Sequence, residues 1–211
     1  MGELSGLSEY LEKTYEKSVF DMVLASGKPW MFHLHGNNSL RASIRENSKW
    51  EVTMEIEGEI EGKGREDIQK IQIKYLYPAD LDESVRPLIK RDQKVATQNL
   101  EPIFAPGLRH FVKNKSLFPL MKEREVLFFT LLEGEIIKGI VTDFSRYDVT
   151  VSMKGGLPVT ILRHSIYNLT NKKGRSFLKT FQERYRDWEN SPLFIPDSDS
   201  EDKNRKGGGP S

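Results

Sequence analysis

Three side chains in the second half of the chain favour binding chemistry: Tyr147, Arg163 and His164. A tyrosine ring can stack on a nucleobase, an arginine can meet a phosphate, and a histidine offers donor and acceptor groups to the edge of a base. Contacts of this kind hold single-stranded RNA. Each side chain also has an ordinary explanation, as a half-buried aromatic of a sheet or as part of a charged bend between strands. Their combination is what points to RNA.

Enzymatic chemistry has weaker support. The chain has four histidines and no cysteine. His33 and His35 alternate along a predicted strand, a spacing that can bind a metal ion, but no Glu-x-x-His pattern or cysteine accompanies them. Gly58, Gly62 and Gly64 lie among glutamates, which would repel a phosphate. No pair of carboxylates stands out as acid and base. We therefore predict no enzyme, no metal site and no cofactor.

Short apolar segments separated by glycine turns surround the three binding side chains. Their alternation and β-branched content predict five strands, at 126–132, 136–142, 147–153, 159–162 and 166–169. Glycines after Glu133 and after Lys154 supply turns. Five short strands within about 45 residues predict a strongly bent β unit of the size of a minimal barrel.

This stretch resembles an Sm-like domain of the bacterial Hfq type, over roughly residues 114–170. Upstream of the strands, residues 117–124 are similar to the N-terminal helix of that family. The other matching features are the Gly134 turn, Lys138-Gly139, the bend residue Phe144, the strand-opening Tyr147 and the sequence Leu162-Arg163-His164-Ser165-Ile166.

The resemblance implies a non-catalytic protein that binds short single-stranded RNA rich in U or A and acts in post-transcriptional regulation. By the family pattern, Tyr147 stacks a uridine-like base, while Arg163 and His164 contact base edge, ribose and phosphate around a ring pore. Four further positions match the polar start of the family's helix and part of its basic rim: Lys113, Asn114, Lys122 and Arg124.

The first half of the chain repeats this stretch at a constant offset of 97. Residues 48–54 align with 145–151, so Trp50 takes the position of Tyr147. A chance match of two strands with similar composition is the alternative. The first copy then departs, with a long acidic loop and a single predicted strand over 68–77. Lys74-Tyr75 falls at the position of Arg163-His164, so the first copy lacks the histidine and we interpret it as degenerate.

The predicted fold is mainly β: two Sm-like (SH3-type), strongly bent five-stranded barrels, each preceded by an α-helix, plus a C-terminal helix. Apolar residues at spacings of three and four predict a helix over 5–24 and another over 176–190. The predicted division is an N-terminal helix with the degenerate domain (1–80), a linker (81–113), the Hfq-like domain (114–170), the C-terminal helix (171–190) and a disordered tail (191–211).

Charge is distributed unevenly. The net charge is +1, but residues 1–80 hold 10 Lys and Arg against 14 Asp and Glu, whereas residues 101–196 hold 15 against 10. The second half is therefore the better binder of a polyanion. No apolar run reaches the roughly 18 residues of a membrane span, and the N-terminus lacks a signal pattern. We expect a cytoplasmic protein without membrane partners, bacterial by the resemblance.

The resemblance also implies self-assembly. In that family strand four of one subunit pairs with strand five of the next, and six or seven domains close a ring. Two domains per chain then predict a homotrimer of about 73 kDa, three times the 24.3 kDa chain. A homohexamer ring built by the second copy alone is the other arrangement. The alternative function is a ring-forming structural or protein-interaction module that has lost RNA binding, favoured by the acidic loop of the first copy.

Overall fold

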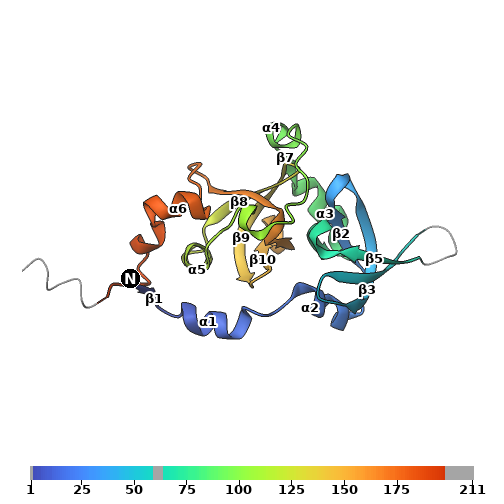
Figure 1. Cartoon of the computed structure of the whole chain (residues 1–211), viewed down its shortest axis with the longest axis horizontal. Helices are drawn as coiled ribbons and strands as arrows, with labels where there is room; N and C mark the ends of the chain where they lie inside the picture. The colour runs from blue at the N-terminus through green and yellow to red at the C-terminus, as the bar shows by residue number, and fades with distance from the viewer. Residues whose placement is uncertain (1, 59–63, 198–211) are drawn as a thin grey trace, which may run out of the picture.

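The computed structural model describes residues 2–58 and 64–197. One large antiparallel sheet dominates it, and several short helices cover the sheet (Figure 1). The α-helices are α1 (Leu7–Thr14), α2 (Val19–Ser26), α3 (Asp82–Val85), α4 (Gln93–Ala96), α5 (Asn114–Lys122) and α6 (Lys179–Tyr185). The strands are β1 (Glu3–Leu4), β2 (Trp30–Leu34), β3 (Ser39–Asn47), β4 (Glu51–Ile56), β5 (Arg65–Gln69), β6 (Ile73–Pro78), β7 (Lys90–Arg91), β8 (Val126–Leu131), β9 (Glu135–Phe144), β10 (Asp148–Ser152), β11 (Pro158–Leu162), β12 (Ile166–Asn171) and β13 (Phe194–Ile195).

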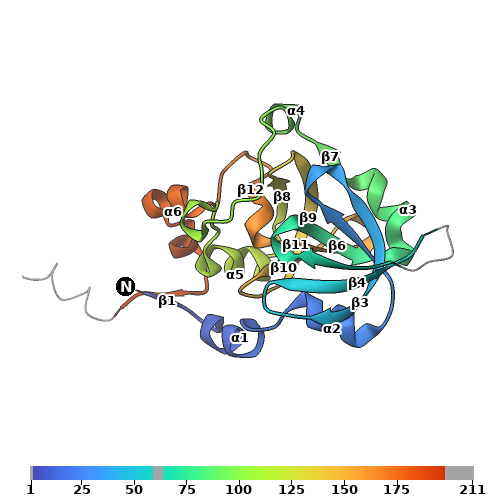
Figure 2. The same ribbon diagram turned by 45° about the vertical axis from the view of Figure 1, so that its right-hand side comes forward.

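The large sheet contains the same strand arrangement twice. Its path is β12-β8-β9-β10-β11-β6-β2-β3-β4-β5, with β7 paired to β9, while β1 and β13 form a separate two-stranded sheet. We call β2 to β6 the first unit and β8 to β12 the second unit. The two units join where β11 pairs with β6, with Thr160 opposite Leu76 and Ile161 opposite Tyr75 (Figure 2).

The sheet is open, and no closed barrel is found among the described residues, where the sequence predicted two strongly bent five-stranded barrels. No strand pairing within 2–58 and 64–197 closes either unit on itself. The reason lies in the join: the outer edge of β11 is used by β6 of the other unit, so it is not available for pairing inside its own unit. The helices expected before each unit are present as α2 and α5.

The internal repeat extends to the backbone register. Val52 lies opposite Asn47 in the first unit and Val149 lies opposite Phe144 in the second, and both positions differ by 97. Each of these ladders carries a β-bulge at the corresponding point. A repeat of register and bulge together is not explained by similar strand composition alone. The strands predicted for the second copy are confirmed to within a few residues by β8 to β12.

The single fourth strand predicted for the first copy is wrong. The segment forms β5 and β6, separated by the 3-10 turn η2 (Lys70–Gln72). The second unit has the same turn as η7 (Arg163–Ser165). Because these turns are offset by 93 residues, Lys70 takes the position of Arg163, and Lys74 lies inside β6. The turn η2 has neither glycine nor proline, so the apolar alternation runs through it unbroken.

The helix expected over 5–24 is two helices that serve different units. Ser18 begins α2, since its side chain accepts a hydrogen bond of 3.2 Å from the Phe20 N–H, and α2 packs on the core of the first unit. The helix α1 packs on the second unit instead, where the Tyr10 ring lies 4.7 Å from the Phe144 ring. The domain boundaries proposed from the sequence stay predictions.

The C-terminal segment pairs with the sheet before it forms a helix. The Phe177 N–H donates to the Leu169 carbonyl of β12 at 2.9 Å, and Ser176 forms a bridge with Thr170. The expected helix over 176–190 is shorter, because α6 ends at Arg186 with φ 41°. Part of the expected tail is folded, since β13 pairs with β1; residues 198–211 lie outside the described part.

Candidate nucleic-acid interface

Tyr147 lies at the turn before β10 and is 46% exposed. The side chain of Ser145 fixes this turn by accepting hydrogen bonds from the backbone N–H groups of Tyr147 at 3.1 Å and Asp148 at 3.2 Å. The Arg146 guanidinium lies 5.6 Å from the Tyr147 ring centre and 6.0 Å from the Tyr15 ring centre. The turn therefore presents an aromatic ring and a cation to solvent from a constrained backbone.

Arg163 is next to Tyr147 through the backbone but not through its side chain. Its N–H donates to the Tyr147 carbonyl at 2.9 Å. The guanidinium points inward, donating from Nη1 to the Val112 carbonyl at 3.3 Å and lying 5.5 Å from the Phe144 ring centre. Its Nε and Nη2 atoms are shielded from solvent, and burial lowers the pKa of Arg163 to about 10 although the nearby Asp148 acts against this. Arg163 is not presented to a phosphate in this conformation.

His164 is held at the join between the units. Its Nε2–H donates to the Ile73 carbonyl of β6 at 2.9 Å. Burial lowers the pKa of His164 to about 4, so the ring is neutral at pH 7. The next residue, Ser165, donates through Oγ to the Lys74 carbonyl at 2.9 Å. The structure thus places the backbone of Arg163, with His164 after it, next to Tyr147, but both side chains point away from the exposed ring.

The four weaker candidates lie on α5 or at its ends. Lys113 is the residue before the helix, and Asn114 is its first residue, with a side-chain Oδ1 shielded from solvent and without a partner among the described atoms. Lys122 is exposed, with Nζ 5.3 Å from the Phe118 ring centre. Arg124 follows the helix with φ 54° and is exposed. Within the described residues, no hydrogen bond or ring contact links this group to Tyr147.

The first unit carries a related arrangement at the same turn. Trp50 is 71% exposed, the most exposed aromatic ring among the described residues, and the Lys49 Nζ lies 4.9 Å from its ring centre. The Lys70 N–H donates to the Trp50 carbonyl at 2.8 Å, the counterpart of the bond from Arg163 to Tyr147. Trp50 was not among the predicted binding residues, although the offset of 97 already aligned it with Tyr147.

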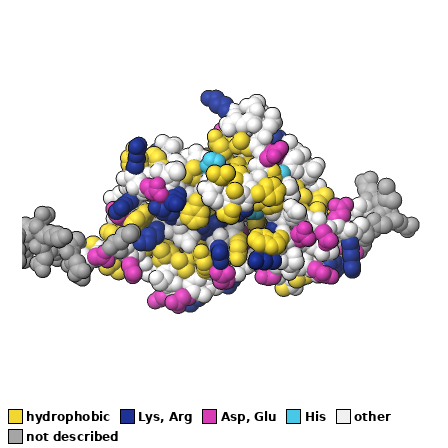
Figure 3. All heavy atoms as spheres, in the orientation of Figure 1, with side chains coloured by type: hydrophobic (Ala, Val, Ile, Leu, Met, Phe, Trp, Pro, Cys, Tyr) yellow, Lys and Arg dark blue, Asp and Glu magenta, His cyan; other side chains and the backbone are white. Residues whose placement is uncertain are grey.

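Charges differ between the two ends of the molecular surface. On the face shown in Figure 3, Lys and Arg side chains interleave with hydrophobic ones over the centre and left, whereas acidic side chains gather towards the right, where β3 and β5 lie. The expected contrast between an acidic first half and a basic second half is therefore visible on this face.

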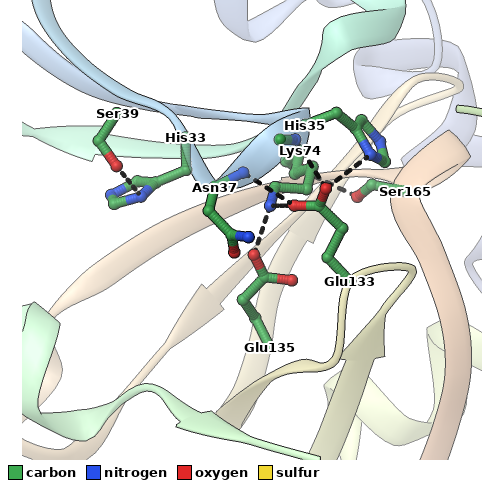
Figure 4. A network of polar contacts seen from close by, with 9 residues as sticks. His33, His35, Asn37, Ser39, Lys74, Glu133, Glu135 and Ser165 are labelled. Atoms are coloured by element: carbon green, nitrogen blue, oxygen red, sulfur yellow. Dashed lines mark hydrogen bonds and ion pairs between the residues drawn. The ribbon is translucent and has the colours of Figure 1, made fainter. Parts of the chain in front are cut away.

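A buried ion cluster joins the two units (Figure 4). Lys74, with 1% of its side chain exposed, donates to the carboxylates of both Glu133 and Glu135. Glu133 also accepts the Gly36 N–H at 2.7 Å. Burial alone would raise the pKa of Glu133. The hydrogen bonds from Lys74 and from the Gly36 N–H, together with the positive charge of Lys74, outweigh burial and lower this pKa below its ordinary value. No local pattern in the sequence indicates this cluster, because Lys74 belongs to the first unit and the two glutamates to the second.

His33 and His35 do not share a site. The His33 ring stacks on Tyr75 at 4.2 Å, and its Nε2 lies 2.9 Å from the Tyr77 hydroxyl. Burial lowers the pKa of His33 to about 4. His35 lies in the following 3-10 turn, 3.8 Å from the Glu133 carboxylate. No group of three or more His, Asp or Glu side chains in the described ranges is arranged to hold a metal ion.

Comparisons with protein-family models, curated proteins and solved structures found no match to this chain. None of the described helices has the length and apolar content needed to cross a lipid bilayer.

Proposed function

We propose that this protein binds short single-stranded RNA without catalysing a reaction, by stacking a base on Tyr147 beside the Arg146 guanidinium. The observation that carries the proposal is this exposed ring and cation on a turn fixed by Ser145. Aromatic stacking contributes about 1–3 kcal/mol per base. The preference for U- or A-rich RNA and the role in cytoplasmic post-transcriptional regulation rest on the resemblance to the Hfq type.

The Sm-like assignment belongs to the same proposal. Two features support it: each unit has five strands preceded by a helix, and the fourth strand of one unit, β11, pairs with the fifth strand of the other, β6. The resemblance implies this type of contact between neighbouring domains. In the proposal Arg146 supplies the cation beside the base. The Arg163 backbone bonds to the turn of Tyr147, and His164 bonds across the join to β6.

Oligonucleotide binding tests the proposal. Fluorescence anisotropy with short labelled oligo-U, oligo-A and oligo-C at two salt concentrations should show binding that weakens as salt rises. Tyr147→Ala should reduce the affinity by about 1–3 kcal/mol, or roughly 5- to 150-fold, while Tyr147→Phe keeps a stacking ring and should stay close to the unmodified protein. No binding of any oligonucleotide, or equal binding by folded Tyr147→Ala, would refute the proposal.

A second candidate is a ring-forming interaction module. The free edge of β5 favours it, because β5 occupies the position in the first unit that β11 has in the second, and β11 pairs with the next unit. A homotrimer or homohexamer would use this edge. In the described structure the edge of β12 that such a partner needs is already paired with residues 175–177 of the same chain. Light scattering separates a single chain of 24.3 kDa from a homotrimer.

A further inference from the structure

We propose that Trp50, with Lys49 and Lys70, forms a second base-stacking site on the first unit, and that this site is the more open of the two. The proposal rests on the proposed binding of single-stranded RNA. It reverses the interpretation of the first copy as degenerate, since the corrected offset places a cation, Lys70, at the position of Arg163.

The turn that carries Trp50 is fixed in the same way as its counterpart. The Ser48 N–H donates to the Glu51 carbonyl at 3.0 Å, and the Ser48 side chain accepts from the Glu51 N–H at 3.1 Å. With the 2.8 Å bond from the Lys70 N–H, three hydrogen bonds fix the backbone on both sides of the indole. A large apolar ring that is 71% exposed on a fixed turn is held ready to stack, so little ordering remains to be done on binding.

One ammonium group lies against the indole, and a second lies on the same turn. The Lys49 Nζ lies 4.9 Å from the ring centre. The Lys70 Nζ donates to the Ser48 carbonyl, and its side chain lies against the Phe20 ring. In the second unit the corresponding Arg163 points inward, towards the Val112 carbonyl and the Phe144 ring. In the first unit no described strand pairs with the outer edge of β5, and both cations remain at the turn.

Acidic side chains near this turn decide which part of RNA it contacts. Glu51 follows Trp50. Burial lowers the pKa of Lys70, and the nearby Asp21 charge acts against this. Asp67 lies on β5 and accepts a hydrogen bond from Thr53 at 2.7 Å. The Asp21 charge offsets part of the attraction of Lys70 for phosphate. The site therefore suits the face of a base.

Tryptophan fluorescence provides a direct test, because Trp50 is the exposed member of three tryptophans: Trp188 is 5% exposed and Trp30 is partly buried. Short unlabelled oligo-U titrated into the full chain should quench the emission. Trp50→Phe should abolish most of the quenching while anisotropy still reports binding, and Trp30→Phe should leave the quenching in place. Trp50→Ala should weaken oligo-U binding roughly 5- to 150-fold, and Trp50→Tyr should restore most of it.

The outcomes distinguish the two proposals. RNA binding that depends on Tyr147, with no quenching and with equal affinity in folded Trp50→Ala, would overturn the second site and leave the proposed function standing. No RNA binding by the unmodified protein in anisotropy would overturn both. Quenching that disappears in Trp50→Phe, together with weaker binding by Trp50→Ala, supports the second site, and circular dichroism of each variant establishes that it is folded.

Discussion

The two units have the same strand order, the same register and the same turn before the fifth strand, yet the side chains on that turn lie in opposite environments. In the first unit Lys70 lies at the turn of an exposed Trp50. In the second unit Arg163 points into the core of its own unit, and His164 is turned towards the join. For His164 the difference arises from what lies beside each turn, since β6 packs against η7 and no described strand pairs with the outer edge of β5. The accessibility of this position in the repeat is therefore set by the neighbouring unit as well as by its own fold.

The largest expected effect on stability comes from the buried ion cluster at the join between the units. Lys74→Met removes the ammonium between Glu133 and Glu135 and leaves two largely buried carboxylates without their cation, so we expect a loss of about 3–5 kcal/mol in the free energy of unfolding. Urea denaturation measures it. Adding Glu133→Gln and Glu135→Gln to Lys74→Met should recover part of the loss. A change below about 1 kcal/mol would mean that this ion cluster does not stabilise the join that holds His164.

One pair of matching positions carries different residues in the two units, because β10 packs closely against the second-unit position. Gly139 in β9 corresponds to Ala42 in β3 at the offset of 97. A Cβ atom at Gly139 would lie 2.4 Å from the Val151 side chain and 2.4 Å from the Ser152 carbonyl oxygen. Gly139→Ala should therefore destabilise the protein by about 1–3 kcal/mol, although alanine is the native residue at the matching site. Equal urea midpoints for Gly139→Ala and the unmodified protein would contradict this close approach.

Protonation of His164, at the join between the units, should destabilise the protein by a smaller amount. The pKa of His164 is about 4 when folded and 6.5 as an unperturbed group, so the unfolded chain binds the extra proton between these values. The free energy of unfolding should fall as pH drops from about 6.5 towards 4, by about 1–2 kcal/mol between pH 7 and pH 5 from this group. His33, with the same shift, adds to it.

The matched variant for this effect is His164→Gln, which can still donate to the Ile73 carbonyl. Its unfolding free energy should depend less on pH than that of the unmodified protein in urea titrations at pH 7 and pH 5. The first unit has Ile71 at the equivalent position, so its own turn should contribute no such dependence. A variant with an unchanged pH dependence would remove His164 as its source.

The strands of the second unit were predictable because glycines mark their turns and apolar residues alternate within them. The first unit was harder at η2, where Lys70-Ile71-Gln72 carries no turn residue, and the error moved the proposed counterpart of Arg163 to Lys74. The candidate site was predictable as far as Tyr147 and its turn. The burial of His164 and the charge cluster depend on the pairing of β11 with β6, and the inward direction of Arg163 depends on its contact with Val112. Both are contacts between distant parts of the chain that local pattern does not encode.

The segment that follows β12 gives the sheet two unlike ends. Arg175 to Phe177 lie along the edge of β12, and Arg175 also forms an ion pair with Asp187 beyond α6, so this edge is covered. At the other end β5 has no outer neighbour among the described strands, and its sequence Arg65-Glu66-Asp67 carries charges of the kind that discourage edge-to-edge pairing. The two-unit sheet thus has one edge covered by its own chain and one edge whose charges discourage pairing with another strand. These two edges limit the continuous sheet to the two units of one chain.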